Sequence, residues 1–310
     1  MSHFLTFFPV LLFSFVGLQL TQSAEKRPNI IFFLIDDLGW SDLGCYGSKY
    51  HLTPNIDKLA ARGIQFTNAY SASSVCSPTR SSVMTGKNPA RLGITDWIGA
   101  SQKYNVLVTP KNVKALSQNE VTFAESLKKS GYATAYFGKW HLGADDKDHP
   151  SLQGFDYHRG VNRAGSPGSY YYPFKRNKTK SKRTLSASDV PDFDTAKKDS
   201  YLTDLLAEEA SKFIEIKRDV PFLLMLAHYS VHTPIQARKN DALRYKDRMK
   251  DIGLSSKVSI KNERYGSTRM TQNNPDYAAM VESVDRSVGK VLGKLEELKL
   301  IDNTFVIFTS

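Results

Sequence analysis

The stretch PNIIFFLIDD, from Pro28 to Asp37, is an apolar run that ends in two acidic residues. A half-buried strand would alternate apolar and polar residues, whereas a continuous apolar run of this length is typical of a strand buried on both faces. Such strands occur in parallel sheets that helices cover on both sides. The run therefore predicts the centre of a parallel sheet, with Asp36 and Asp37 at its carboxyl end.

Helix-like and strand-like segments alternate along most of the remaining chain. We expect helices, several of them marked by an N-cap, an early proline or a closing glycine, at 53–63, 77–86, 121–131, 201–218 and 274–300. We expect further strands at 63–71, at the start of 132–143, at the start of 221–234 and, buried on both faces, at 303–310. The alternation predicts an α/β fold with a mainly parallel sheet flanked by helices on both faces.

The segment from Gly143 to Ser200 is rich in Gly, Pro, Tyr, Lys and Asp and predicts a long surface excursion. It contains KRNKTKSKR, Lys175 to Arg183, in which six of nine residues are basic. One interpretation of this run is a solvated loop, and the other is a cationic lip that steers anions toward a site. Asn177 begins a glycosylation sequon, which has meaning only outside bacteria.

Residues 1–24 predict a secretory signal peptide. The apolar run from Phe4 to Leu20 is interrupted by Pro9, is short for a membrane span, and is followed by small residues up to Ala24 that suit cleavage. We therefore expect a mature chain from Glu25 onward and a secreted or periplasmic protein. A retained membrane anchor is the alternative.

The composition suits a globular protein that attracts anions. The chain has 310 residues, 41% of them hydrophobic, and a formal net charge of +11, enough for one large α/β domain or two ordinary ones. An exported protein rarely meets nucleic acid, so sulfated or phosphorylated polymers are the expected partners; a basic, solvated surface is the alternative. Two cysteines make no disulfide scaffold, although an oxidising compartment permits one bridge between Cys45 and Cys76.

Several chemically active residues follow predicted strands, and ligands of parallel sheets bind at that edge. These residues are Asp36, Asp37, Lys139, His141 and His232. Adjacent carboxylates favour a hard cation, Ca²⁺ or Mg²⁺, although solvated turn acids are as common. In an extended segment Lys139 and His141 would point to one face, where they could neutralise an anion and exchange protons. Taken singly, they would be a surface lysine and a partly buried histidine.

The stretch CSPTRSSVMTGK, Cys76 to Lys87, places a cysteine where a helix should begin. Ser77 and Pro78 suit the N-cap and the first helical position, so Cys76 would lie at the positive end of the helix dipole, beside free N–H groups. Arg80 could reach back to the same place with its planar donor fork. A thiol there is a candidate nucleophile for an anionic substrate. The three residues between Cys76 and Arg80 are fewer than thiol phosphatases have.

Five stretches together resemble the sulfatase family of the alkaline-phosphatase-like superfamily. They are PNIIFFLIDDLGWSDLGCYG, TPNIDKLAARGIQFTNAYS, CSPTRSSVMTGK, GKWHLG and HTP, and they occur in the family's order over most of the mature chain. Cys-x-Pro-x-Arg followed by Thr-Gly is the most specific of these motifs. The resemblance implies that Cys76 is oxidised after translation to Cα-formylglycine, whose hydrate is the nucleophile, by a formylglycine-generating or anaerobic maturation enzyme.

The resemblance also implies roles for the other candidates. Asp36, Asp37 and the modified Cys76 would ligate Ca²⁺, which the family favours over Mg²⁺, and Arg80 would support them. Lys139 would bind sulfate oxygens.

Two histidines would then move protons. His141 would act on the second hydroxyl of the hydrate, and His232 would contact the bridging oxygen and help to protonate the departing alcohol. The HTP motif favours His232 over His228, which could be a core histidine.

The resemblance departs from the family pattern at the end of the chain. The family carries an Asp-Asn pair just after the strand that matches FVIFTS, then a substrate-binding lysine and a smaller subdomain, whereas the sequence ends at Ser310. We therefore expect residues 25–310 to be the N-terminal part of a sulfatase catalytic domain, with weakened calcium binding and activity.

The leading hypothesis is an exported sulfate-ester hydrolase acting on sulfated carbohydrates. The first alternative is a related phosphodiesterase or phosphonate hydrolase that uses the same nucleophile. The second is a non-catalytic, exported polyanion-binding protein in which Cys76 stays a thiol or pairs with Cys45.

Overall fold

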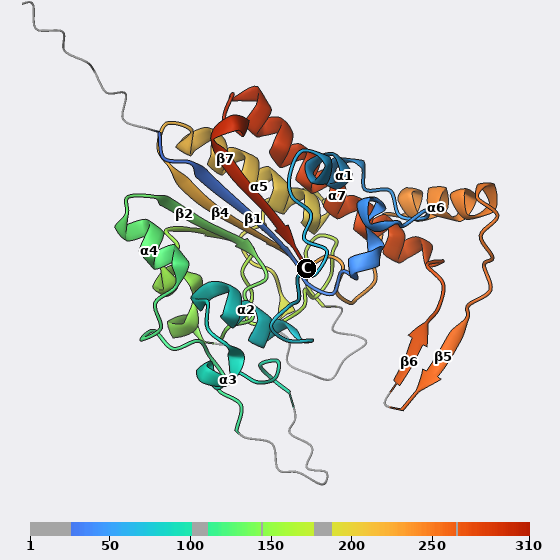
Figure 1. The fold of residues 1–310 in the computed structure, drawn as a ribbon, viewed down its shortest axis with the longest axis horizontal. Helices are drawn as coiled ribbons and strands as arrows, with labels where there is room; N and C mark the ends of the chain where they lie inside the picture. Colours follow the sequence, from blue (N-terminus) through green and yellow to red (C-terminus); the bar gives the residue numbers. More distant parts are fainter. Residues whose placement is uncertain (1–25, 101–110, 144, 177–187, 265) are drawn as a thin grey trace, which may run out of the picture.

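The computed structural model of the protein describes residues 26–100, 111–143, 145–176, 188–264 and 266–310. Its centre is a five-stranded sheet in the order β3-β2-β4-β1-β7, and every neighbouring pair is parallel (Figure 1). The strands are β1 (Asn29–Ile35), β2 (Ala133–Gly138), β3 (Tyr157–Arg159), β4 (Phe222–His228) and β7 (Thr304–Thr309). The predicted parallel α/β architecture is confirmed. The predicted signal peptide and most of the basic run 175–183 lie outside the described residues.

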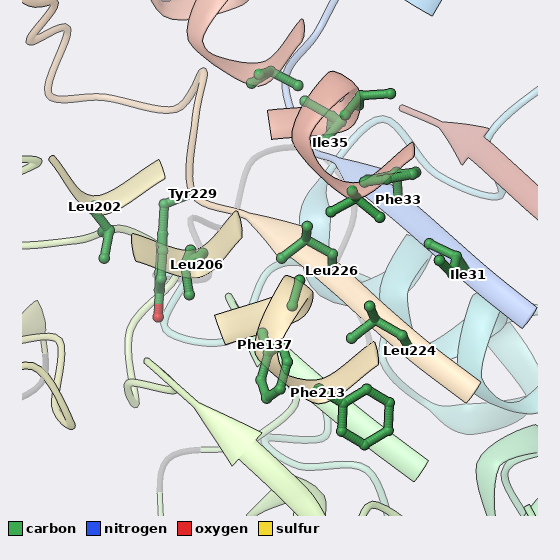
Figure 2. Close-up of a cluster of buried hydrophobic side chains, with 14 of the residues drawn as sticks. Ile31, Phe33, Ile35, Phe137, Leu202, Leu206, Phe213, Leu224, Leu226 and Tyr229 are labelled. Carbon is green, nitrogen blue, oxygen red and sulfur yellow. The ribbon is translucent and has the colours of Figure 1, made fainter. Parts of the chain in front are cut away.

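The apolar run that predicted the sheet is its β1 strand, which lies between β4 and β7. Alternate side chains of β1 enter two different hydrophobic clusters. Ile31, Phe33 and Ile35 pack with side chains of α5 (Leu202–Lys217) and α7 (Pro275–Glu297) (Figure 2). Leu34 packs on the other face, with side chains of α2 (Cys76–Thr85) and α4 (Phe123–Lys129). A strand covered on both faces needs apolar residues at every position, which explains the unbroken run.

The helices cover the two faces of the sheet as the alternation predicted (Figure 1). Besides α2, α4, α5 and α7, the structure has α1 (Pro54–Ala61), α3 (Pro89–Leu92) and α6 (Lys239–Asp251). Asn274 caps α7 as predicted, because its side chain accepts from the backbone N–H groups of Asp276 and Tyr277. Among the described residues, no helix combines the length and the apolar content that a membrane crossing requires.

A hairpin of β5 (Ile260–Glu263) and β6 (Gly266–Arg269) extends from the body beside α6 (Figure 1). Its four-residue strands are exposed along their whole length, so the hairpin has no buried face of its own. We had predicted neither α6 nor this hairpin.

Two predicted strands differ from the structure. Segment 63–71 is an irregular connection, and its large side chains Ile64, Phe66 and Tyr70 are exposed. In the described part of the chain it pairs with no strand, so its β-like pattern has no backbone partner. Strand β7 does form, but it lies at the edge of the sheet with Phe305 and Ile307 exposed. The prediction that it is buried on both faces is therefore wrong for this structure.

The prediction that residues 143–200 form only a surface excursion is also wrong. Strand β3 pairs with β2 and extends the sheet by one edge strand. The aromatic side chains of Phe155, Tyr170 and Phe174 are buried in the two cores. Their burial supplies the apolar area that holds this segment against the sheet.

Candidate active site

A buried ion triad lies at the carboxyl end of β1 and β2. The guanidinium of Arg80 on α2 contacts both carboxylate oxygens of Asp36, Nε to Oδ2 at 2.9 Å and Nη2 to Oδ1 at 2.9 Å. Lys139 Nζ lies 2.8 Å from Asp36 Oδ2. Burial alone would raise the pKa of Asp36, but the positive charges of Arg80 and Lys139 and the hydrogen bond from Arg80 hold it well below its usual range. Asp36 is therefore ionised at neutral pH.

The triad carries an excess of cationic groups over acids. Both cations are buried, Lys139 completely so. Arg80 Nη2 and Lys139 Nζ lie at ion-pair distance from Asp36, yet neither has a hydrogen bond of good geometry to any described group. Buried donors without aligned acceptors are rare and need an explanation. An anion with several oxygens would provide those acceptors.

Tyr136 on β2 is hydrogen-bonded to the guanidinium of Arg80. Its hydroxyl accepts from Arg80 Nη1 at 2.9 Å, and both the hydroxyl and Nη1 donate to the backbone carbonyl of Lys139. The ring packs edge-on against Trp140 and Phe155, and burial raises the pKa of Tyr136 to about 12. The hydroxyl thus stays protonated and links the arginine to the backbone of the lysine.

Cys76 faces a histidine base. Its Sγ lies 3.0 Å from His141 Nδ1, while His141 Nε2 lies 3.0 Å from the carbonyl oxygen of Ile98. A carbonyl only accepts hydrogen bonds, so we assign the ring proton to Nε2, which leaves Nδ1 as an acceptor toward the thiol. Burial and the charge of Lys139 lower the pKa of His141 to about 4, so the ring is neutral at pH 7.

The position of Cys76 differs slightly from the prediction. Helix α2 begins at Cys76 itself, with Val75 as N-cap, whereas we had predicted Ser77 as the cap. The Ser77 hydroxyl is engaged elsewhere, because it accepts from the backbone N–H of Ile98 at 3.0 Å. Cys76 still lies in the first helical turn, where free N–H groups and the helix dipole favour anions. Cys45 and Cys76 are free thiols, so the alternative of a disulfide between them is wrong for this structure.

Two candidates adopt left-handed backbone conformations. Asp37 has φ 64° and His141 has φ 53°, a region that costs energy for residues other than glycine and that clusters at functional sites. The segment is therefore not extended at His141, which was the condition for Lys139 and His141 to point to one face. Both side chains nevertheless reach the site, Lys139 to Asp36 and His141 to Cys76.

Gly165 packs directly against the ring of His141. A Cβ atom built at Gly165 would lie 2.5 Å from His141 Nδ1, so any side chain there would displace the ring. The loop that carries this glycine belongs to the segment predicted as a surface excursion.

His232 and His228 are clearly separated by the fold. His232 Nε2 lies 3.5 Å from Asp37 Oδ2 at the carboxyl edge. His228 is fully buried, with Nε2 2.7 Å from the Ser287 hydroxyl of α7. The geometry agrees with the HTP-based choice of His232 as the site histidine and places His228 in the core.

The two carboxylates are the type of ligand that a hard cation prefers, but they are too few to hold one by themselves. Asp36 and Asp37 offer the oxygen ligands that Ca²⁺ prefers, and Ca²⁺ takes about six to eight of them. The described residues contain no group of three or more His, Cys, Asp or Glu side chains placed to hold a metal. Asp36 and Asp37 alone would therefore supply too few ligands for such a cation.

Sequence reasoning missed Tyr136, Trp97 and Gly165, which surround the candidate residues. Tyr136 lies on the predicted strand beside the Lys139 motif, but period-two alternation gave no sign of its hydroxyl partner. Trp97, whose ring centroid lies 6.4 Å from that of His141, belongs to a loop with no recognised motif. These contacts join residues 24 to 56 positions apart in the chain and carry no local signal.

A parallel sheet with acidic, cationic, thiol and imidazole groups at its carboxyl edge defines an α/β protein with a candidate anion site. The family model described as Sulfatase matches residues 28–310. The chain belongs to the sulfatase family.

Named relatives agree with this membership. N-acetylgalactosamine-6-sulfatase of Homo sapiens is 33% identical over 298 residues, which are 93% of this chain and 50% of that protein. Steryl-sulfatase of Homo sapiens is 30% identical, over 97% of this chain and 57% of that protein. The chain thus spans about half the length of the curated relatives it matches.

A solved structure agrees as well. The crystal structure of Ps i-CgsB in complex with k-i-k-neocarrahexaose superposes with a TM-score of 0.69 at 30% identity, covering 91% of this chain and 58% of that one.

Proposed function

We propose that the protein hydrolyses sulfate esters of carbohydrates. The observation that carries the proposal is the buried Asp36–Arg80–Lys139 triad, with unaligned cationic donors, beside the Cys76–His141 pair in a chain of the sulfatase family. In the overall reaction an S–O bond of the ester breaks, water supplies the oxygen that joins sulfur, and the alcohol leaves with a proton.

We propose that Cys76 is the site of conversion to Cα-formylglycine by a separate maturation enzyme. The group would supply a hydrated aldehyde as the nucleophile at the first turn of α2. His141 Nδ1, neutral and 3.0 Å from Cys76 Sγ, is placed to take a proton from a group at that position. Ile98 holds the opposite nitrogen of the ring and so keeps the accepting nitrogen toward Cys76.

The charged residues would bind the sulfate group and the cation, and His232 would supply a proton. Lys139 and Arg80 would bind sulfate oxygens, since a preorganised, buried cation stabilises charge that moves onto them. Asp36 and Asp37 would hold Ca²⁺, which would act as a Lewis acid when bound. His232, beside Asp37, would hold the proton that the departing alcohol takes.

The substrate class rests on charge and on the named relatives. A chain with net charge +11 favours polyanionic substrates, and the relatives include one named N-acetylgalactosamine-6-sulfatase and one solved in complex with k-i-k-neocarrahexaose. With the predicted signal peptide, these features support an exported enzyme that acts outside the cytoplasm.

The test is made on the whole natural protein purified from its own host. We expect mass spectrometry of the Cys76 peptide to find the aldehyde, and turnover of sulfate esters to exceed that of matched phosphate esters at least tenfold. Removal of Ca²⁺ with a chelator should abolish turnover, and added Ca²⁺ should restore it. An unmodified Cys76 in an active enzyme, or a preference for phosphate esters, would contradict the proposal.

A further inference from the structure

Trp97 presents a large aromatic ring to solvent at the margin of the candidate site. Its side chain is 43% exposed, although tryptophan normally buries most of its area. Its ring centroid lies 6.4 Å from that of His141, with the planes at 41°. The Trp97 ring thus lies next to the imidazole of His141, which faces Cys76.

The loop that carries Trp97 is held in place by several specific hydrogen bonds. Asn112 Oδ1 accepts from the backbone N–H of Thr95 at 3.0 Å, and Asn112 Nδ2 donates to the carbonyl of Asp96 at 3.0 Å. The Asp96 carboxylate accepts from the N–H of Trp97 itself at 2.7 Å. An exposed ring on a braced backbone is preorganised for contact with a ligand.

Gly99 keeps one side of the ring clear. Its backbone has φ +106°, and a Cβ atom there would lie 3.0 Å from Trp97 Cζ3. A side chain at this position would therefore press on the ring as well as strain the backbone.

The same loop is tied to both parts of the reactive pair. The N–H of Ile98, the residue after Trp97, donates to the hydroxyl of Ser77, the neighbour of Cys76. The carbonyl of Ile98 accepts from His141 Nε2. Because Ile98 fixes the loop to α2 and to the base, the position of Trp97 relative to the reacting group is set by short contacts.

We infer that Trp97 is a platform on which the sugar ring of a sulfated carbohydrate stacks while its sulfate binds to Arg80 and Lys139. An aromatic face is electron-rich, and the C–H face of a pyranose offers it polarised hydrogens and apolar area. This inference rests on the proposed function and deepens it, because it assigns a contact to the sugar rather than to the sulfate. Trp97 would set specificity and would take no part in proton transfer.

The experiment separates sugar binding from sulfate binding. In the whole natural protein carrying Cys76→Ala, which prevents turnover, affinities are measured by calorimetry for inorganic sulfate, N-acetylgalactosamine 6-sulfate and a carrageenan oligosaccharide. With Trp97→Ala we expect affinity for the tighter-binding sugar to fall by about tenfold or more, with affinity for sulfate changed less than about twofold. Trp97→Phe should keep sugar affinity within about threefold, because it keeps an aromatic face.

Trp40 provides the matched control, because it is also an exposed tryptophan and lies on the short helix η1 (Trp40–Asp42). Trp40→Ala should leave both affinities within about twofold. The platform is refuted if Trp97→Ala weakens sulfate and sugar equally, if Trp40→Ala produces the same sugar-specific loss, or if the parent binds no sugar sulfate more tightly than free sulfate. A parent that binds none of the three ligands would instead refute the proposed function.

Discussion

Two buried histidines, at the ends of neighbouring strands, illustrate how the same residue type serves different purposes. His141 follows β2 and His228 closes β4, and burial lowers the pKa of each, to about 4 and about 3. Both ring nitrogens of His141 have partners, the Cys76 thiol and the Ile98 carbonyl. His228 has one partner, Ser287, and its Nδ1 has none among the described residues. Burial alone therefore does not distinguish the candidate catalytic histidine from the core histidine; the group that the ring faces does.

The surroundings of the two rings explain the difference. His141 lies beside the charged Asp36–Arg80–Lys139 triad, where an anion can be held. His228 lies beneath α7, among side chains that pack the sheet. The comparison predicts that changes on the His141 side reduce activity, whereas changes at His228 alter only stability.

The largest effect should follow from Arg80→Met, which removes the main partner of Asp36. Removing one member of a buried ion pair costs roughly 3–5 kcal/mol of folding free energy, and because Asp36 keeps its contact with Lys139 we expect a loss at the lower end of that range. The proposed sulfate-binding group also loses a cation, so we expect turnover to fall by about a thousandfold. Chemical denaturation and steady-state kinetics would measure the two losses.

The double variant Asp36→Asn, Arg80→Met serves as the control for the stability loss. It should recover neither folding free energy nor activity, because Lys139 is then buried without its carboxylate partner. Near-parental turnover in Arg80→Met would contradict the proposed role of Arg80 in binding sulfate.

Matched substitution of the two histidines should give the next largest effect. His141→Gln removes the base that faces Cys76, and we expect kcat to fall by about 10²- to 10⁴-fold. His228→Gln should keep kcat within about threefold, measured well below its unfolding temperature, because His228 has no contact with the triad. Equal losses in both variants would remove the distinction between the two sites.

The smallest effect is the pH dependence of stability. An unfolded histidine binds a proton below a pH of about 6.5, whereas the folded protein keeps His228 neutral until about pH 3. Stability contributed by neutral His228 is therefore complete above pH 6.5 and is lost as the pH falls, at up to about 1.4 kcal/mol per pH unit.

Denaturation of parent and His228→Gln between pH 7 and pH 4.5 measures this slope. The variant should lose stability less steeply as the pH falls. His141→Gln should also reduce the slope of stability against pH in this range, because the pKa of His141 is lowered too. The two histidines would then match in their effect on stability and differ in their effect on activity. A variant slope equal to that of the parent would show that His228 is not held neutral.

Much of the fold followed from local patterns. The unbroken apolar run of β1, the Asn274 cap of α7 and the periodic apolar face of α5 depend on residues a few positions apart, and all three segments form as predicted. The strand prediction for segment 63–71 is wrong because a β-like pattern forms a strand only where a partner strand is available. The predicted cap at Ser77 failed because Ile98, distant in the chain, takes its hydroxyl.

The sequence by itself determined the parallel α/β architecture and the set of polar residues at the carboxyl edge, because strand direction and side-chain periodicity are local properties. Only the tertiary structure decided which groups meet: Arg80 with Asp36, His141 with Cys76. It also separated His232 from His228 and brought Trp97 to the base. Those pairings join residues far apart in the chain, and they depend on how helices and loops pack against the sheet, which no local pattern encodes.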